Sequence, residues 1–65
     1  MKGPKVPPEI GQRVMFCDQE RAVPARIIAV LGEDRVNLLL ESDPVEGANA
    51  VNYGKLGYCW HELVE

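Results

Sequence analysis

The chain has 65 residues, enough for one domain at most, and a domain this short buries only about 60% of its unfolded surface. Seven basic against ten acidic residues give a net charge of −3, so nucleic-acid and membrane-surface binding are both disfavoured. The hydrophobic fraction of 46% is typical of a folded chain, no apolar run approaches the ~20 residues of a membrane span, and the N-terminus lacks a signal peptide's apolar segment. We therefore expect a cytoplasmic protein whose cysteines stay reduced.

The first ten residues predict an extended, proline-rich arm. Pro4, Pro7 and Pro8 each lack a backbone donor and restrict φ, which favours extended chain. Such an arm either is poorly ordered or docks on a neighbouring subunit, and both alternatives stay open. We assign residues 1–10 to the arm and residues 11–65 to a single β domain.

From Gly11 onward the pattern predicts five short strands, at residues 12–17, 23–31, 36–41, 51–53 and 58–63. Pro24 cannot donate to a ladder, so it belongs at the start or on an edge of the second strand. Residues 32–35 have hairpin character, and residues 42–50 form the longest loop. Five strands in so short a chain favour a closed barrel, because closure removes the unpaired edges.

Alternation along the strands predicts the core. The residues expected to point inward are Val14, Phe16, Ile27, Ala29, Leu31, Val36, Leu38 and Leu40. The second strand is apolar on its other face too, where Ile28 and Val30 point outward beside Leu39 of the third strand. Scattered outward apolar residues are ordinary, whereas a contiguous patch indicates a partner contact. Ile28, Val30 and Leu39 are therefore the predicted protein-contact surface, and the arm is a second candidate.

The order "GQRVMF … ARIIAV … VNLLLE … VNY … YCWHELVE" resembles a group of small phage and prophage proteins. Their pattern is G-x-x-V-x-[YF], A-x-I-V-x-x-V, V-N-L-x-V and a terminal T-W-H-W-P-E. The resemblance runs from Gly11 to the end of the chain, and its most specific pieces are residues 36–38 and 60–61. It implies an SH3-like barrel of phage or prophage origin with no assigned activity. Cys59 stands here where the pattern has Thr, and Glu62-Leu63 replaces Trp-Pro.

In an SH3-like barrel the first and last strands are neighbours, so Cys17 and Cys59 are expected to approach each other. A disulfide between them is one alternative. The other, favoured by a reducing compartment, is two free cysteines, with Cys59 buried and His61 partly exposed. Cys17, Cys59 and His61 supply three ligands where structural zinc needs four, so we predict no metal and no cofactor. A Cys–His nucleophile would need a third group and a substrate cleft, so we predict no catalytic residue.

The aromatic residues near the end of the chain have two interpretations. Trp60 and one tyrosine are expected in the core, because a small domain needs its large side chains inside. The alternative is a groove of Tyr53, Tyr58 and Trp60 for a proline-rich peptide. Asn37, between two apolar residues, is either solvated or hydrogen-bonded to a neighbouring loop.

These features predict an all-β, non-enzymatic protein that works as a protein-binding or self-associating barrel, in the host cytoplasm or associated with the virion. An alternative is a nucleic-acid-binding barrel of the Tudor or KOW kind, which the net charge disfavours. A remote alternative is the type II dihydrofolate reductase, a barrel of similar length. The Gln-Ile-Tyr that lines that enzyme's pore is replaced here by Val51-Asn52-Tyr53, and a shared fold alone does not imply a shared function.

Overall fold

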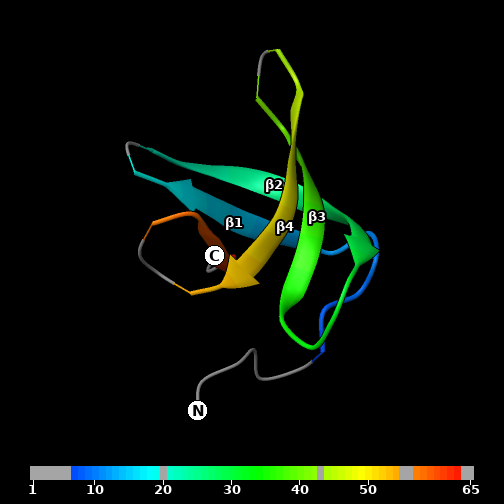
Figure 1. Cartoon of the computed structure of the whole chain (residues 1–65). Helices are drawn as coiled ribbons and strands as arrows, with labels where there is room; N and C mark the ends of the chain where they lie inside the picture. The colour runs from blue at the N-terminus through cyan, green and yellow to red at the C-terminus, as the bar shows by residue number, and fades with distance from the viewer. Residues whose placement is uncertain (1–6, 20, 43, 55–56, 64–65) are drawn as a thin grey trace.

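The computed structural model describes residues 7–19, 21–42, 44–54 and 57–63, which form a closed five-stranded barrel (Figure 1). The strands are β1 (Arg13–Asp18), β2 (Arg21–Val30), β3 (Arg35–Leu40), β4 (Glu46–Tyr53) and β5 (Cys59–Glu62). The predicted all-β barrel is confirmed, and the arrangement is consistent with an SH3-like barrel. Most of the predicted arm, residues 1–6, lies outside the described residues.

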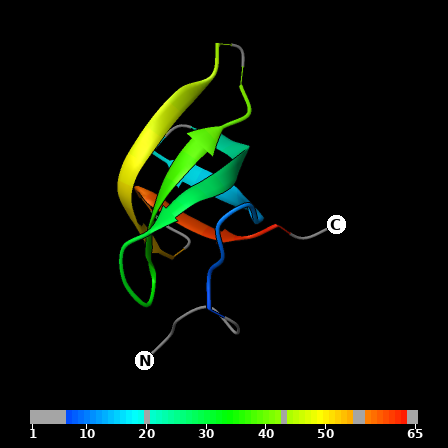
Figure 2. The ribbon, with the colours of Figure 1, turned by 90° about the vertical axis from the view of Figure 1, so that its right-hand side faces the viewer.

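The ring of strands runs in chain order and closes where β5 pairs with both β4 and β1. Four of the five pairings are antiparallel, and β4–β5 is parallel. An odd number of strands makes one parallel neighbour pair unavoidable, because directions cannot alternate around the ring. The parallel ladder is confined to two residue pairs, Asn52 with Cys59 and Tyr53 with Trp60. Figure 2 shows the strands curving around a common interior.

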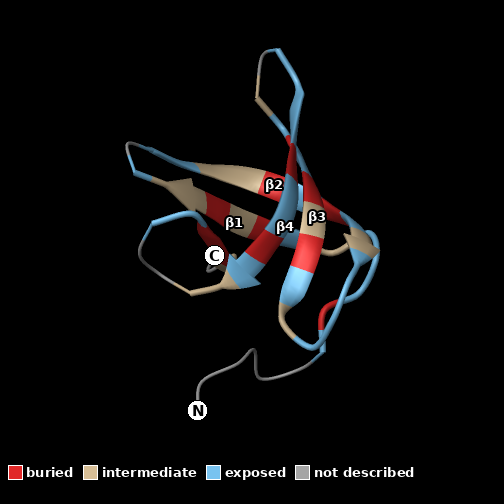
Figure 3. Ribbon diagram, viewed as in Figure 1, coloured by how far each residue is buried: buried red, intermediate tan, exposed pale blue. Residues whose placement is uncertain are grey.

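All five strands contribute to the core (Figure 3). Its members are Val14, Phe16, Ala25, Ile27, Val36, Leu38, Leu40, Ala48, Val51 and Trp60, with Val23 and Tyr53 packed against them. The inward positions predicted on the first and third strands are confirmed. Trp60 is fully buried and donates its indole Nε1–H to the backbone carbonyl of Asp34, 2.9 Å away. Burial of the largest side chain thus also ties β5 to the β2–β3 hairpin.

A β-bulge in β2 changes which of its side chains face the core. Ile27 pairs with Leu38, but the next registered pair is Ala29 with Asn37, so β2 has one extra residue at Ile28. Alternation therefore restarts after the bulge. The predicted inward position of Leu31 is wrong: its side chain is 51% exposed, and Ala29 is only partly buried.

The strand β4 is longer than predicted, and it contains a second bulge. The strand begins at Glu46, inside the segment expected to be a loop, because residues 46–48 pair with β3 despite their low strand propensity. Asn49 and Ala50 both lie opposite Asn37, and Ala50 has φ of 55°. The Asn37 side-chain oxygen accepts the Ala50 amide at 2.9 Å. Of the two alternatives for Asn37, the structure therefore has the hydrogen-bonded one.

The first two residues of the β domain, which follow the arm, continue the β1–β2 ladder. The Gly11 amide donates to the Ile27 carbonyl at 2.8 Å, and the Ile27 amide donates to the Gln12 carbonyl at 2.9 Å. Pro24 lies within β2, where its carbonyl accepts the Glu41 amide at 3.0 Å, just beyond the last registered β2–β3 pair. The missing proline donor therefore falls at an end of that ladder, as expected. Among the described residues there is no helix of the length and apolarity needed to cross a membrane.

Candidate functional site

Four apolar side chains around the β2–β3 hairpin are exposed, and we call them the apolar surface. The predicted contact residues Ile28, Val30 and Leu39 are 47%, 40% and 42% exposed, and Leu31 joins them. Their exposure agrees with the sequence prediction, while their role in binding stays a prediction. In a domain with so few core residues, large apolar side chains that remain exposed are the first candidates for a contact with another protein.

The register shows how these residues are placed. Leu39 lies opposite Arg26 on the outer side of β3, and Ile28, two residues after Arg26, lies at the bulge beside Ala29. Ile28 and Leu39 are therefore diagonal neighbours outside the barrel. Val30 pairs instead with the core residue Val36, so it belongs to the open end of the barrel rather than to the outer face. Simple alternation predicted that Ile28, Val30 and Leu39 all lie on the outer face. Because of the bulge, only Ile28 and Leu39 do so.

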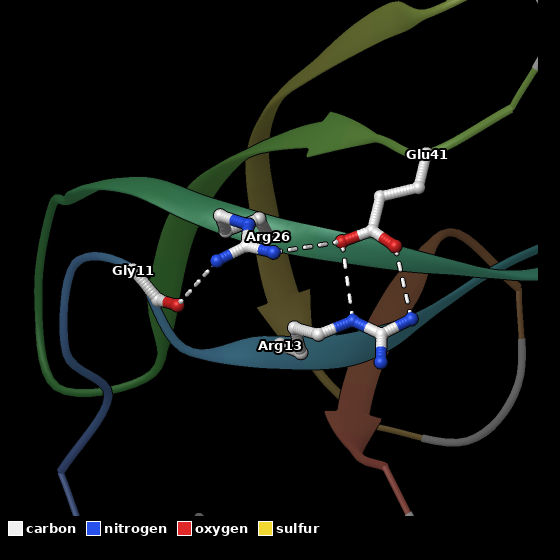
Figure 4. Close-up of polar contacts among 4 residues, drawn as sticks. All are labelled: Gly11, Arg13, Arg26 and Glu41. Atoms are coloured by element: carbon white, nitrogen blue, oxygen red, sulfur yellow. Dashed lines mark hydrogen bonds and ion pairs between the residues drawn. The ribbon is translucent and has the colours of Figure 1, made fainter.

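A cluster of three charged residues borders the apolar surface (Figure 4). Glu41 accepts two hydrogen bonds from Arg13, at 3.2 Å from Nε and 2.9 Å from Nη2, and contacts Arg26 Nη2 at 3.5 Å. Arg26 also reaches the Gly11 carbonyl at 3.4 Å. Hydrogen bonds from Arg13, and the positive charges of both arginines, lower the pKa of the Glu41 carboxyl. One carboxylate thereby partly neutralises two neighbouring arginines.

A second ion pair lies at the β1–β2 turn. Arg21 contacts Asp18 Oδ2 at 3.3 Å and makes a short hydrogen bond to Glu46. The hydrogen bond to Glu46, and then the one to Asp18, raise the pKa of Arg21 above its ordinary value. Together with the cluster around Glu41, this pairing means that Arg13, Arg21 and Arg26 all contact carboxylates. That arrangement disfavours a phosphate-binding face.

Cys17 and Cys59 face each other across the closing seam of the barrel, as registered partners of β1 and β5. Both are free. Since Ile27 donates to Gln12, even-numbered residues of β1 direct their backbone groups to β2 and odd-numbered ones to β5. The cysteines therefore occupy a hydrogen-bonded pair, where opposing Cβ atoms lie about 5.5 Å apart. A disulfide needs about 3.5–4.5 Å, so the register favours free thiols.

Cys59 is buried outside the core, on the side of β5 opposite Trp60. A Cβ placed on Gly54 would meet its Cβ at 3.5 Å and its Sγ at 3.9 Å, and its Sγ lies 3.7 Å from the Gly57 carbonyl. Burial chiefly, and then the neighbouring Cys17 thiol, raise the pKa of Cys59. The Cys59 thiol is therefore a poor nucleophile at neutral pH.

His61 and Met15 form the next pair along this seam, and both are partly buried. The His61 Nδ1 lies 3.0 Å from the Glu62 carbonyl. Within the described residues no group of three or more histidine, cysteine or acidic side chains has a geometry that holds a metal ion.

The aromatic residues do not form an open groove. Tyr53 packs edge-on against the buried Trp60 with ring centroids 4.9 Å apart, and its hydroxyl makes a short hydrogen bond to the Glu62 carboxylate. That hydrogen bond, followed by burial, raises the pKa of Tyr53. Tyr58 is exposed on one side and packs edge-on against Phe16 at 5.2 Å. Trp60 and Tyr53 are thus core residues, as the sequence predicted.

No protein-family model, no curated protein and no solved structure matches this chain. Of the residues that shape these surfaces, the sequence pointed to Ile28, Val30, Leu39, Cys17 and Cys59. It missed Leu31, because a bulge reverses its direction. It also missed the pairing of Glu41 with Arg13, since residues 28 positions apart carry no local signal of contact.

Proposed function

We propose that this chain is a small non-enzymatic protein of phage or prophage origin that acts as a self-associating β-barrel through its apolar surface. The observation that carries the proposal is the exposure of Ile28 and Leu39, at 47% and 42%, as diagonal neighbours outside the barrel. The β4–β5 ladder that closes the barrel has only two residue pairs, and we place the association on the exposed side chains beside the β2–β3 hairpin instead. The phage origin rests on the sequence motifs at residues 36–38 and 60–61.

We favour a second copy of the chain as the partner that binds the apolar surface, and two observations support this choice. A domain of this length has a small core and gains stability from further burial in an oligomer. A two-fold interface also brings identical surfaces together, so unpaired charges at its border would repel. Here Arg13 and Arg26 are both bound to Glu41, whose single negative charge removes part of that repulsion.

The described end of the arm is a second contributor to this contact. Ile10 is 70% exposed, and the neighbouring Gly11 amide is bonded to the Ile27 carbonyl, directly before Ile28. The backbone near Ile10 is therefore held close to the apolar surface. An arm placed there lies beside any copy that docks on Ile28.

Size-exclusion chromatography with light scattering, over a wide range of protein concentrations, tests the proposal. We expect a concentration-dependent dimer that Leu39→Ser or Ile28→Ser converts to monomer. Val45→Ser is the matched control, because Val45 is 60% exposed but lies in the β3–β4 loop. A wild-type chain that stays monomeric at the highest concentration, or a Val45→Ser variant that dissociates as readily as Leu39→Ser, would overturn self-association through this surface.

A further inference from the structure

The outer side of the β1–β5 seam gathers an unusual set of side chains. Cys17 lies opposite Cys59, and Met15 opposite His61, in a ladder with no register shift. Trp60 and Phe16, the residues between them, point into the core, so these four side chains share the other face. Three of the four carry sulfur. We call these four residues the seam cluster.

The spacing of the two cysteines suits a bridging ion better than a bond between the sulfurs. Opposing Cβ atoms at a hydrogen-bonded pair are about 5.5 Å apart, beyond the disulfide range. Two thiolates bound to one ion lie about 4.0–4.6 Å apart, between the trigonal and the linear arrangement of metal–sulfur bonds of about 2.3 Å. Rotation about the two Cα–Cβ bonds changes the distance between the sulfur atoms while the strands keep their register.

The donor set selects the class of metal. Zinc requires four ligands in a closed site, and the described residues hold no cluster of three or more histidine, cysteine and acidic side chains of suitable geometry. Soft monovalent ions accept fewer ligands and prefer thiolate and thioether sulfur. We propose that Cys17 and Cys59 form a two-thiolate site for a soft monovalent ion of the Cu(I) class, with the Met15 thioether as a third ligand.

Access and proton balance follow from the geometry. Cys59 is covered by Gly54 and Gly57, so the ion enters from the side of the half-buried Cys17. The thiolate is the form that binds metal, so each cysteine that enters as a thiol gives up one proton as its metal–sulfur bond forms. The apparent affinity for Cu(I) therefore rises with pH. No electron is transferred in this step.

The test is an anaerobic titration of the full chain with Cu(I), in competition with a chromophoric Cu(I) chelator. We expect one equivalent to bind, with ultraviolet thiolate-to-copper absorption. Cys17→Ser should lower the affinity by more than about 100-fold, and Met15→Leu by about 10-fold. His61→Ala is the matched control on the same face and should change the affinity by less than about 2-fold. Affinity should fall as the pH is lowered.

Three results would overturn the proposal. Cys17→Ser binding as tightly as the wild type would show an adventitious site elsewhere. A loss in His61→Ala equal to that in Cys17→Ser would make the site a Cys–His one. Zinc binding as tight as Cu(I) would exclude a two-thiolate donor set. Trp60 fluorescence checks the fold of every variant, and if Cys59→Ser does not fold, the decision rests on Cys17→Ser and Met15→Leu.

Discussion

The outer face of the barrel differs between the β2–β3 hairpin and the β1–β5 seam. Beside the hairpin, Ile28 and Leu39 are exposed next to arginines that a single carboxylate binds. At the seam, sulfur atoms and an imidazole lie in two regular pairs, and Cys59 is covered by Gly54 and Gly57. One region is suited to burying apolar area, the other to holding a small soft ligand.

The difference arises from the regularity of pairing. The β1–β5 ladder has no shift, so alternation sets every side chain and places like residues opposite each other. The β2–β3 and β3–β4 ladders each contain a shift, and both shifts fall opposite Asn37. A bulge re-aims the side chains beside it. Ile28 stays on the outside, where alternation places it, while Val30 is paired with the core residue Val36 and turns toward the barrel opening. The regular β1–β5 ladder therefore holds its side chains in fixed opposing pairs, whereas the bulged β2–β3 ladder redirects the side chains that follow the bulge.

The largest effect is expected from removing the core side chain that supports both regions. Trp60→Ala removes the largest core side chain, its contact with Tyr53 and its hydrogen bond to Asp34, so we expect a loss of about 3–5 kcal/mol in unfolding free energy. Tyr58→Ala, the matched aromatic change beside the same strand, should cost about 1 kcal/mol. Urea unfolding measures both. Equal losses in the two variants would contradict the anchoring role of Trp60.

A more selective change alters the bulged region alone. Asn37→Ala removes the acceptor of the Ala50 amide and should lower the unfolding free energy by about 1–2 kcal/mol. It should also weaken self-association, since the bulge that presents Ile28 lies opposite Asn37, while Cu(I) affinity stays unchanged. Asn52→Ala, which removes only an exposed bond to Arg35, should stay within about 0.5 kcal/mol. If the two variants lose the same unfolding free energy, the hydrogen bond from the Ala50 amide to Asn37 does not stabilise the bulge.

Backbone strain at the second bulge offers a stabilising change. Ala50 has φ of 55°, a conformation that costs a residue with a side chain about 1–2 kcal/mol. Ala50→Gly removes that cost but adds chain entropy, so we expect a net gain of about 0.5–1 kcal/mol. Ala22→Gly, an exposed β2 position without positive φ, should instead lose about 0.5–1 kcal/mol. Thermal unfolding shows whether each variant gains or loses stability. A loss in both variants would contradict backbone strain at Ala50.

The smallest expected effect concerns Glu41 and pH. Because Arg13 lowers the pKa of Glu41 in the folded chain, the contribution of Glu41 to stability is present above its unfolded pKa and is lost as the pH falls through its folded pKa. Glu41→Gln should therefore be slightly less stable than the wild type at neutral pH, and equal to it in acid. Glu33→Gln, exposed in the β2–β3 hairpin, is the control. A difference that grows in acid would contradict this sign.

Glu41→Gln is also expected to affect the two regions differently. Without the carboxylate, Arg13 and Arg26 meet their counterparts across a two-fold interface unneutralised, and dimerisation should weaken. Cu(I) binding at the seam should not change. Equal dimerisation by Glu41→Gln and the wild type would show that these charges lie outside the interface.

Local pattern was enough to predict much of this barrel. Val14, Phe16, Val36, Leu38 and Leu40 alternate with polar or outward residues, and period-two alternation requires only that one face be buried. Trp60 was predictable as a core residue because a small domain has few large side chains to fill its interior. The opposition of Cys17 and Cys59 followed from the pairing of first and last strands in an SH3-like barrel. These features depend on the chain's own sequence or on the order of its strands.

The remaining features depend on contacts between distant segments. The direction of Leu31, the start of β4 at Glu46 and the φ of Ala50 follow from bulges, which exist only once β3 pairs with both of its neighbours. The hydrogen-bonded position of the two cysteines is likewise set by which side of β1 faces β2. Sequence alone determined which residues need burial. Tertiary pairing decided register, because inter-strand hydrogen bonds select one alignment among several that bury the same side chains.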